Sequence, residues 1–153
     1  SECGRAVSCA PGSEQYEWLQ ADLAANSNRC TLAFWHISLI SSWVEGGWVE
    51  VRPFWELLYA ANADVVINGH THVYDRYAPM DPYGNPDPER GLRQFIVGTG
   101  GAYLQTDFVM PATIESHIQS WGVLRLELGP DYYNWAFITT DGSIADQGTG
   151  YCH

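Results

Sequence analysis

Apolar and polar positions divide the first half of the chain into a helix, a strand, a second helix and a second strand. Apolar residues recur at helical spacing behind the helix-capping residue Ser13, which predicts a helix from about 13 to 26. The runs 31–35 and 64–68 are almost uniformly apolar, as expected of strands buried on both faces. Between them, Pro53 begins a second helix of about ten residues.

The strand–helix–strand order of this half predicts a βαβ unit. The two strands should then be parallel and joined by a right-handed crossover. Their carboxyl ends lie on one edge of the sheet, where ligands usually bind in α/β folds. His36 follows the first strand directly, and His70 and His72 follow the second in the sequence Gly-His-Thr-His. The topology therefore gathers these three histidines.

The second half of the chain reads as a loop followed by further strands. Residues 73–92 are rich in Pro, Gly and Asp and are predicted to form a polar loop outside the core. A third short strand is predicted over 94–97, and 122–128 with 132–140 form an antiparallel hairpin that leads through a turn at 141–142 into a last short strand. The expected fold is α/β, with a mixed buried sheet, flanking helices and this C-terminal antiparallel hairpin.

Size and charge limit the classes of function. The 153 residues suffice for a single domain, 1–153, and carry 18 acidic against 7 basic residues, a net charge of −11. Such an acidic surface disfavours nucleic-acid and membrane-surface binding, and no apolar run approaches the roughly 18 residues of a membrane span. The sequence opens at Ser1 without an apolar leader, so we expect a processed product or part of a longer chain.

The histidines predict a metal site. Two histidines two residues apart after Gly69 can direct both imidazoles into one small volume, because glycine leaves the backbone free of a side chain. Neutral imidazole binds iron, zinc and manganese, and the sequence does not choose among them. Taken alone, His36, His70 and His72 could form a single zinc site with an open position.

Two blocks of sequence resemble a known family. The segment 36–42 (HISLISS) and the segment 69–76 (GHTHVYDR) resemble the last two metal-binding blocks of calcineurin-like metallophosphoesterases, most closely the purple acid phosphatases and their secreted bacterial relatives. The flanks 15–23, 95–101 and 148–153 match as well. The resemblance implies hydrolysis of phosphate esters at a two-metal centre and the second half of the four-layer sandwich of that family.

Carried over by position, the resemblance implies metal ligands and supporting residues. His36 and His70 would ligate one metal and His72 the other. Asp75 and Arg76 would hold the loop or reach a substrate phosphate; the alternative is a local ion pair between them.

The chain departs from the family pattern at three positions. Ser38 replaces a proline, Ile40 an aromatic residue and Asp75 a glutamate, and none of these changes removes a metal ligand.

The motifs of the family's first half are not found in this sequence. No histidine precedes His36, and Asp22 is the only earlier aspartate, so the bridging carboxylate and the other ligands are lacking. Two cations without carboxylates repel each other strongly. The chain therefore resembles the C-terminal half of such an enzyme and is expected to be inactive alone. An N-terminal half or another chain would cover an exposed apolar sheet face, and self-association is the other outcome.

Four cysteines allow three pairings. Cys3 with Cys9 would close a short loop, and Cys30 with Cys152 could tie the first predicted strand to the C-terminal tail. Free thiols and metal thiolates remain open. Disulfides favour an oxidising, secreted or extracellular setting.

The remaining residues carry weaker signals. His117 is interpreted as a solvated loop histidine. The glycine-rich segment 98–101 is interpreted as a turn; the alternative is a backbone cradle for phosphate. Trp43 and Trp48 follow His36 in a polar-flanked loop and could line a substrate groove or an interface. A Ser-His-Asp triad through Ser41 or Ser42 lacks a nucleophile elbow. A second hypothesis of another class is a non-catalytic structural or assembly module on the same fold.

Overall fold

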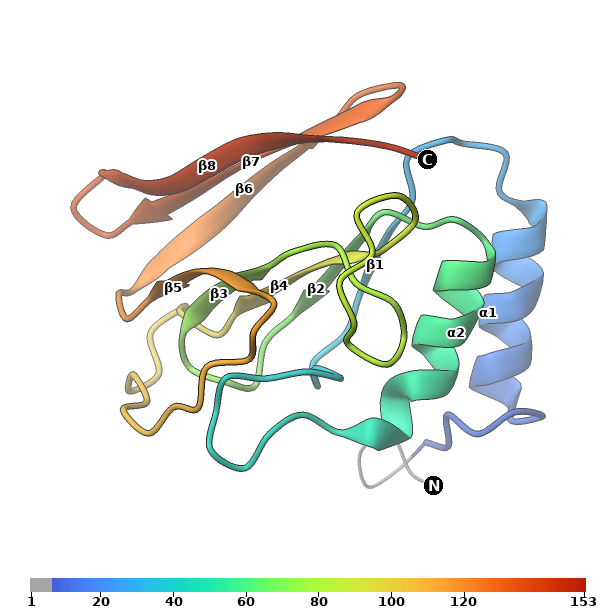
Figure 1. Ribbon diagram of the computed structural model, residues 1–153, viewed down its shortest axis with the longest axis horizontal. Helices are drawn as coiled ribbons and strands as arrows, with labels where there is room; N and C mark the ends of the chain where they lie inside the picture. Colours follow the sequence, from blue (N-terminus) through green and yellow to red (C-terminus); the bar gives the residue numbers. More distant parts are fainter. Residues whose placement is uncertain (1–6) are drawn as a thin grey trace.

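The computed structural model describes residues 7–153 as two helices beside two stacked sheets (Figure 1). Its helical segments are α1 (Glu14–Ala25), the 3-10 turn η1 (Val49–Val51) and α2 (Arg52–Ala60). Its strands are β1 (Leu32–Phe34), β2 (Val65–Asn68), β3 (Tyr74–Tyr77), β4 (Arg93–Val97), β5 (Ile114–Ile118), β6 (Gly122–Leu128), β7 (Tyr132–Thr139) and β8 (Ile144–Tyr151).

The larger sheet is mixed and has the order β1-β2-β4-β3-β5. Strands β1, β2 and β4 are parallel, and β3 runs antiparallel to both of its neighbours. The expected parallel pairing of the first two strands is therefore confirmed, and so are the strand near 94–97 and the hairpin of β6 with β7. The last strand, β8, has eight residues and is longer than the short strand that was expected.

Two apolar clusters hold the layers together. On one face of the larger sheet, Trp55 and Leu58 of α2 pack with Val66 of β2. On the other face, Val65 and Phe95 pack against the three-stranded sheet. Because adjacent strand residues point to opposite faces, Val65 and Val66 are both fully buried, in different clusters. The order of layers is helices, mixed sheet and antiparallel sheet.

The predicted first helix forms with the expected cap. The Ser13 hydroxyl accepts a hydrogen bond from the backbone N–H of Tyr16, and Glu14 and Glu17 lie in the first turn, where their charge opposes the helix dipole. No residue of α1 is buried. The helix lies against α2 and leaves Trp18 62% exposed.

The expectation that 73–92 forms a loop outside the core is wrong. This segment contains β3, in which Tyr74 and Asp75 are fully buried, and it continues to the buried Met80. Charged residues concealed this strand in the sequence. Their burial is tolerated because hydrogen-bonding partners on both sides of the sheet satisfy them, as described below.

The expectation that 31–35 is buried on both faces is also wrong. Strand β1 forms there, but it is the outermost strand of the sheet, and Phe34 is 80% exposed. The two apolar clusters pack on opposite faces of the mixed sheet, and the Phe34 side chain is exposed at this edge.

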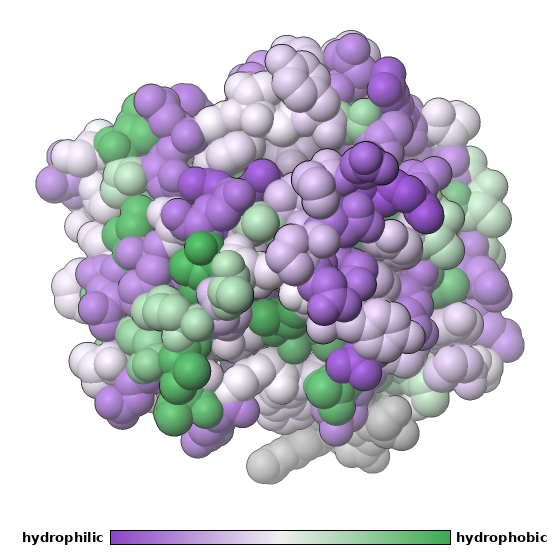
Figure 2. Space-filling model, viewed as in Figure 1, coloured by the Kyte–Doolittle hydropathy of each residue, from purple (hydrophilic) through white to green (hydrophobic). Residues whose placement is uncertain are grey.

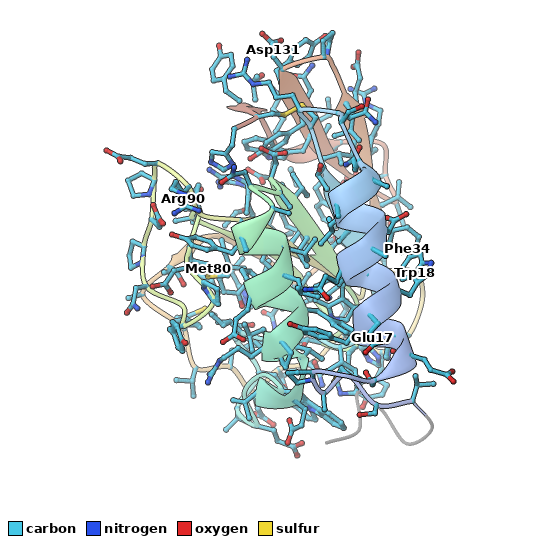
Figure 3. All side chains as sticks on the ribbon, turned by 90° about the vertical axis from the view of Figure 1, so that its right-hand side faces the viewer. Glu17, Trp18, Phe34, Met80, Arg90 and Asp131 are labelled. Atoms are coloured by element: carbon cyan, nitrogen blue, oxygen red, sulfur yellow. A yellow bond between two sulfur atoms is a disulfide. The ribbon has the colours of Figure 1, made fainter. Side chains whose placement is uncertain are left out.

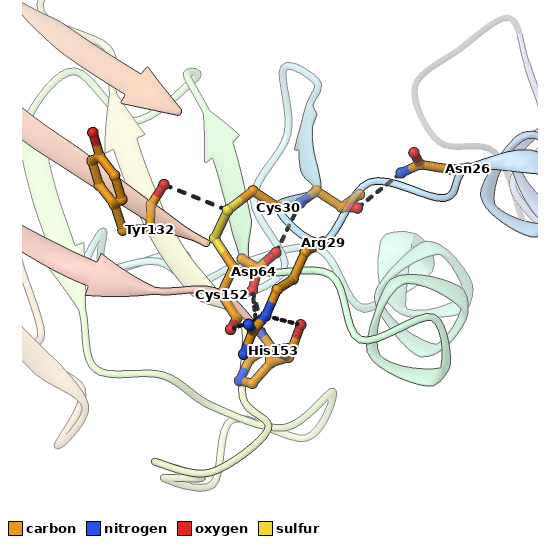
Figure 4. Close-up of a disulfide and its surroundings, with 8 residues drawn as sticks. Asn26, Arg29, Cys30, Asp64, Tyr132, Cys152 and His153 are labelled. Atoms are coloured by element: carbon orange, nitrogen blue, oxygen red, sulfur yellow. Dashed lines mark hydrogen bonds and ion pairs between the residues drawn. A yellow bond between two sulfur atoms is a disulfide. The ribbon is translucent and has the colours of Figure 1, made fainter. Parts of the chain in front are cut away.

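A disulfide joins the start of the first strand region to the C-terminal tail. Cys30 and Cys152 are bonded across 122 positions of sequence, which confirms that expected pair (Figure 4). Beside it, the buried carboxylate of Asp64 accepts hydrogen bonds from the backbone N–H groups of Thr31 and His153. The other expected pair involves Cys3, which lies outside the described residues.

The surface carries only scattered apolar groups on the face of Figure 2. One group lies at the lower left, where Figure 1 shows the loop between β4 and β5. Val109 and Met110 of that loop are exposed. Among residues 7–153, no helix is long and apolar enough to cross a membrane.

Candidate functional site

His36 and His70 lie together at the carboxyl ends of β1 and β2. The two strands are paired in parallel from Leu32 with Val65 onward, so the residues that follow them emerge at one edge. The Nε2 atom of His36 lies 3.3 Å from the Nδ1 atom of His70, and the two rings meet edge to face. The sequence predicted that the topology gathers His36, His70 and His72, and the structure brings the first two of them into contact.

The backbone of His70 adopts an uncommon conformation. Its φ is 63°, in the left-handed region that residues other than glycine rarely occupy. The N–H of the next residue, Thr71, donates to the carbonyl of Gly69 at 2.8 Å and closes a tight turn around His70. Backbone strain of this kind is concentrated at functional sites.

The electrostatic surroundings of His70 favour its neutral form. Burial lowers the pKa of the His70 imidazole, and the neighbouring His36 and His72 lower it further. A neutral imidazole has the free lone pair that a metal requires.

His72 lies on the same turn but has partners of its own. Its backbone N–H donates to the side-chain oxygen of Gln105 at 2.8 Å, and its Nδ1 lies 2.8 Å from the carbonyl oxygen of Tyr103. That oxygen can only accept, so Nδ1 is the donor in this contact. Tyr103 also packs its ring against the imidazole.

The His36–His70 pair fits a metal ion. Two nitrogens bound tetrahedrally to one zinc ion at about 2.0–2.1 Å lie roughly 3.3–3.4 Å apart, and the pair has this separation. Within residues 7–153, no three His, Cys, Asp or Glu side chains converge into a group that could hold a metal. The spacing therefore allows His36 and His70 to offer two nitrogen ligands, which is less than a complete metal site.

Two tryptophans enclose His70. The rings of Trp43 and Trp48 each meet the His70 ring edge to face, with centroids 6.0 Å away. Trp43 is held by an isolated bridge to Phe108, and Trp48 remains 39% exposed. The two residues singled out in the loop after His36 thus lie beside the histidine pair.

Asp75 of β3 is fully buried and bound to His117. Its carboxylate lies 2.6 Å from the Ser42 hydroxyl and 2.6 Å from Nδ1 of His117. Burial raises the pKa of Asp75, and the hydrogen bonds from Ser42 and His117 oppose that rise. His117 is therefore not a solvated loop residue: it lies in β5, directly opposite Asp75 in the strand register.

Arg76 faces the opposite side of β3 from Asp75. Its guanidinium binds Asp146 of β8 through two nitrogens, at 2.7 and 3.2 Å, and also pairs with Glu115. The alternative of an ion pair between Asp75 and Arg76 is therefore excluded, because neighbouring strand residues point to opposite faces. Arg76 instead joins the two sheets.

Sequence reasoning missed Gln105 and Tyr103, the partners of His72. Both lie in an irregular segment that follows the Gly98–Gly101 turn, where no periodicity marks a buried or functional position. Strand β5 was detectable, because Ile114 and Ile118 frame a polar stretch with β-forming ends.

No protein-family model matches the chain. Comparison with curated proteins finds purple acid phosphatases of Arabidopsis thaliana. Purple acid phosphatase 22 is 36% identical over 97 residues, which make up 58% of this chain and 21% of that protein. Purple acid phosphatase 15 is 34% identical over 105 residues, or 64% of this chain and 19% of that protein. The chain spans about a fifth of the length of these relatives.

Solved structures share the fold. The purple acid phosphatase PPD1 from yellow lupin (Lupinus luteus) seeds superposes with a TM-score of 0.79 at 22% identity, over 92% of this chain and 28% of that one. GAP50, the anchor in the inner membrane complex of Plasmodium, superposes with a TM-score of 0.76 at 14% identity, over 90% of this chain and 42% of that one. PhoD superposes with a TM-score of 0.56 at 13% identity, over 92% of this chain and 32% of that one. The chain is distantly similar to purple acid phosphatases and has the fold of part of those chains.

Proposed function

We propose that this chain is the C-terminal portion of a metallophosphoesterase domain of the secreted, bacterial purple acid phosphatase type, and that it supplies histidine ligands to a two-metal site that hydrolyses phosphate esters. The observation that carries the proposal is the 3.3 Å approach of His36 Nε2 to His70 Nδ1 at the edge formed by two parallel strands. The resemblance of the segments 36–42 and 69–76 to the family's metal-binding blocks supports it.

In this proposal, His36 and His70 hold one metal and His72 contributes to the second. Bound metals of this kind polarise a phosphoryl group and neutralise the charge that develops on its oxygens. Iron, zinc and manganese all suit imidazole ligands. The remaining carboxylate ligands come from a segment outside this chain, so hydrolysis of 4-nitrophenyl phosphate is expected only when that segment is present.

A secreted or extracellular location is part of the proposal. The Cys30–Cys152 disulfide supports it, because such bonds persist in oxidising compartments.

Replacing either histidine of the pair is expected to weaken metal binding. His36→Ala and His70→Ala each remove one of two nitrogen ligands, so the affinity for Zn²⁺ should fall at least about tenfold. Isothermal titration of the 153-residue chain with Zn²⁺ measures this. His153→Ala is the matched control, because His153 lies at the disulfide, where its backbone binds Asp64, and its affinity should match that of the wild type. Wild-type affinity in both test variants would refute the proposed site.

A second candidate function is a non-catalytic assembly module, and the open edge at β1 favours it. The carbonyl of Thr31 and the N–H of Trp35 both bind β2, so the peptide groups of Leu32 and Phe34 point outward. A groove of about 520 Å³ lies between this strand and α1. Trp18 and Phe34 line it and lie together beside α1 (Figure 3).

The occupant that fits this edge is an extended polypeptide strand. Only a backbone offers donors and acceptors in the spacing of the outward peptide groups of Leu32 and Phe34. The relatives are about five times as long as the part they share with this chain, so a longer polypeptide of this kind has strands to supply. The description of GAP50, which has this fold, as an anchor also favours an assembly role.

Self-association is the expected behaviour of the uncovered edge. Phe34→Lys should lower the dimeric fraction by tenfold or more in light scattering coupled to gel filtration, because a charge in the groove opposes pairing. Val123→Lys, at an exposed apolar residue of β6, is the control and should associate as the wild type does. A wild type that stays monomeric at all concentrations, or equal effects of both variants, would contradict self-association through this edge.

A further inference from the structure

The backbone around His36 is held from the end of β2. Asn68, the last residue of β2, is 2% exposed. Its side-chain nitrogen donates to the carbonyls of Trp35, at 3.0 Å, and Ile37, at 3.4 Å. The carbonyl of His36 between them accepts from the N–H of Gly69 at 3.0 Å. Two consecutive residues, Asn68 and Gly69, therefore bind three consecutive carbonyls.

The same two residues lead directly into His70. The backbone that anchors His36 is thus continuous with the backbone that carries its partner, and the main chain of one histidine moves relative to that of the other only if these hydrogen bonds break. The His36 ring also lies close to Gly69, because a Cβ atom at Gly69 would be 3.4 Å from Nδ1 of His36. Ligand pairs held by such outer contacts bind metals more tightly, since less freedom is lost on binding.

The side chain of Asn68 carries a cost in stability. Its side-chain oxygen is buried and has no hydrogen-bond partner within residues 7–153. A buried, unsatisfied acceptor destabilises a fold, and a leucine of similar volume would avoid that penalty. Leucine could not donate to the carbonyls of Trp35 and Ile37, so the side-chain NH₂ group is what this position requires.

We propose that Asn68 is a positioning residue for the metal-binding pair: it fixes His36 so that Nε2 faces Nδ1 of His70. The inference rests on the proposed function in its use of metal binding, but the positioning itself concerns only residues of this chain.

Gln94 provides a matched control. It is also a buried amide, and its nitrogen donates to the same loop at the carbonyl of Ile40, at 2.7 Å. Its oxygen likewise has no hydrogen-bond partner among the residues that the structure describes. Its hydrogen bond lies four residues beyond His36. Gln94→Leu therefore removes a comparable interaction without releasing the histidine.

The test compares Asn68→Leu with Gln94→Leu in two measurements. In Zn²⁺ titrations, Asn68→Leu should lose about tenfold to a hundredfold in affinity, and Gln94→Leu should stay within about twofold of the wild type. In NMR spectra without added metal, the nuclear Overhauser contact between the rings of His36 and His70 should disappear in Asn68→Leu and persist in Gln94→Leu. Asn68→Ser, whose hydroxyl cannot span both carbonyls, replaces Asn68→Leu if that variant does not fold.

The two measurements separate this proposal from the proposed function. Retention of the ring contact in the Asn68 variants, or equal losses in the Asn68 and Gln94 variants, would overturn the positioning role. A wild type that binds no Zn²⁺ would contradict the metal site alone, and the ring contact would still decide whether Asn68 positions His36.

Discussion

Replacing both Cys30 and Cys152 by serine is expected to lower the free energy of unfolding by about 4–5 kcal/mol. The disulfide closes a loop of 122 positions, and the loss of chain entropy in the unfolded state on closing a loop of this length amounts to roughly 5 kcal/mol. Urea unfolding followed by tryptophan fluorescence measures the change.

A reducing agent provides the control for this prediction. It should destabilise the wild type by about the same 4–5 kcal/mol and should change the double variant far less, because the Cys30–Cys152 bond is already absent there. A loss below about 1 kcal/mol in the double variant would mean that this bond does not constrain the unfolded chain as the loop model requires.

Replacing Asp146 by alanine is also expected to lower the free energy of unfolding strongly. Its side chain is 12% exposed and binds Arg76, which is 14% exposed, together with the hydroxyl of Tyr74 at 2.6 Å. Removing Asp146 leaves the Arg76 guanidinium with one carboxylate, that of Glu115, in place of two, and takes the acceptor from the Tyr74 hydroxyl. The free energy of unfolding should therefore fall by about 3 kcal/mol. Asp131→Ala, at an exposed turn, should stay within about 0.5 kcal/mol of the wild type.

The effect of Asp146 should depend on pH. Burial raises the pKa of this carboxyl, but the hydrogen bonds from Arg76 and Tyr74 outweigh burial and place the pKa below its ordinary value of 3.8. A depressed pKa stabilises the fold above the unfolded value, and the contribution is lost as the pH falls through the folded value. The difference between wild type and Asp146→Asn should therefore be full near pH 6 and shrink below about pH 4. A difference that stays constant to pH 2 would contradict this account.

The sequence by itself determined that His36 and His70 lie together. Apolar runs and a capped helix predict the βαβ unit, and parallel strands necessarily end at one edge. His36 and His70 follow those strands directly and meet there. The hairpin of β6 with β7 was equally visible, because its alternation and its turn are local signals.

Only the tertiary structure decided the burial of the polar residues. Asp75 and Arg76 look like loop residues until β5 and β8 bring His117 and Asp146 beside them. Edge position is decided in the same way: β1 has the composition of a central strand, but no strand among residues 7–153 pairs with its outer side, and Phe34 stays exposed. Periodicity reports which elements form, whereas the partners of a buried charge or of an edge strand come from distant parts of the chain and are fixed only by packing.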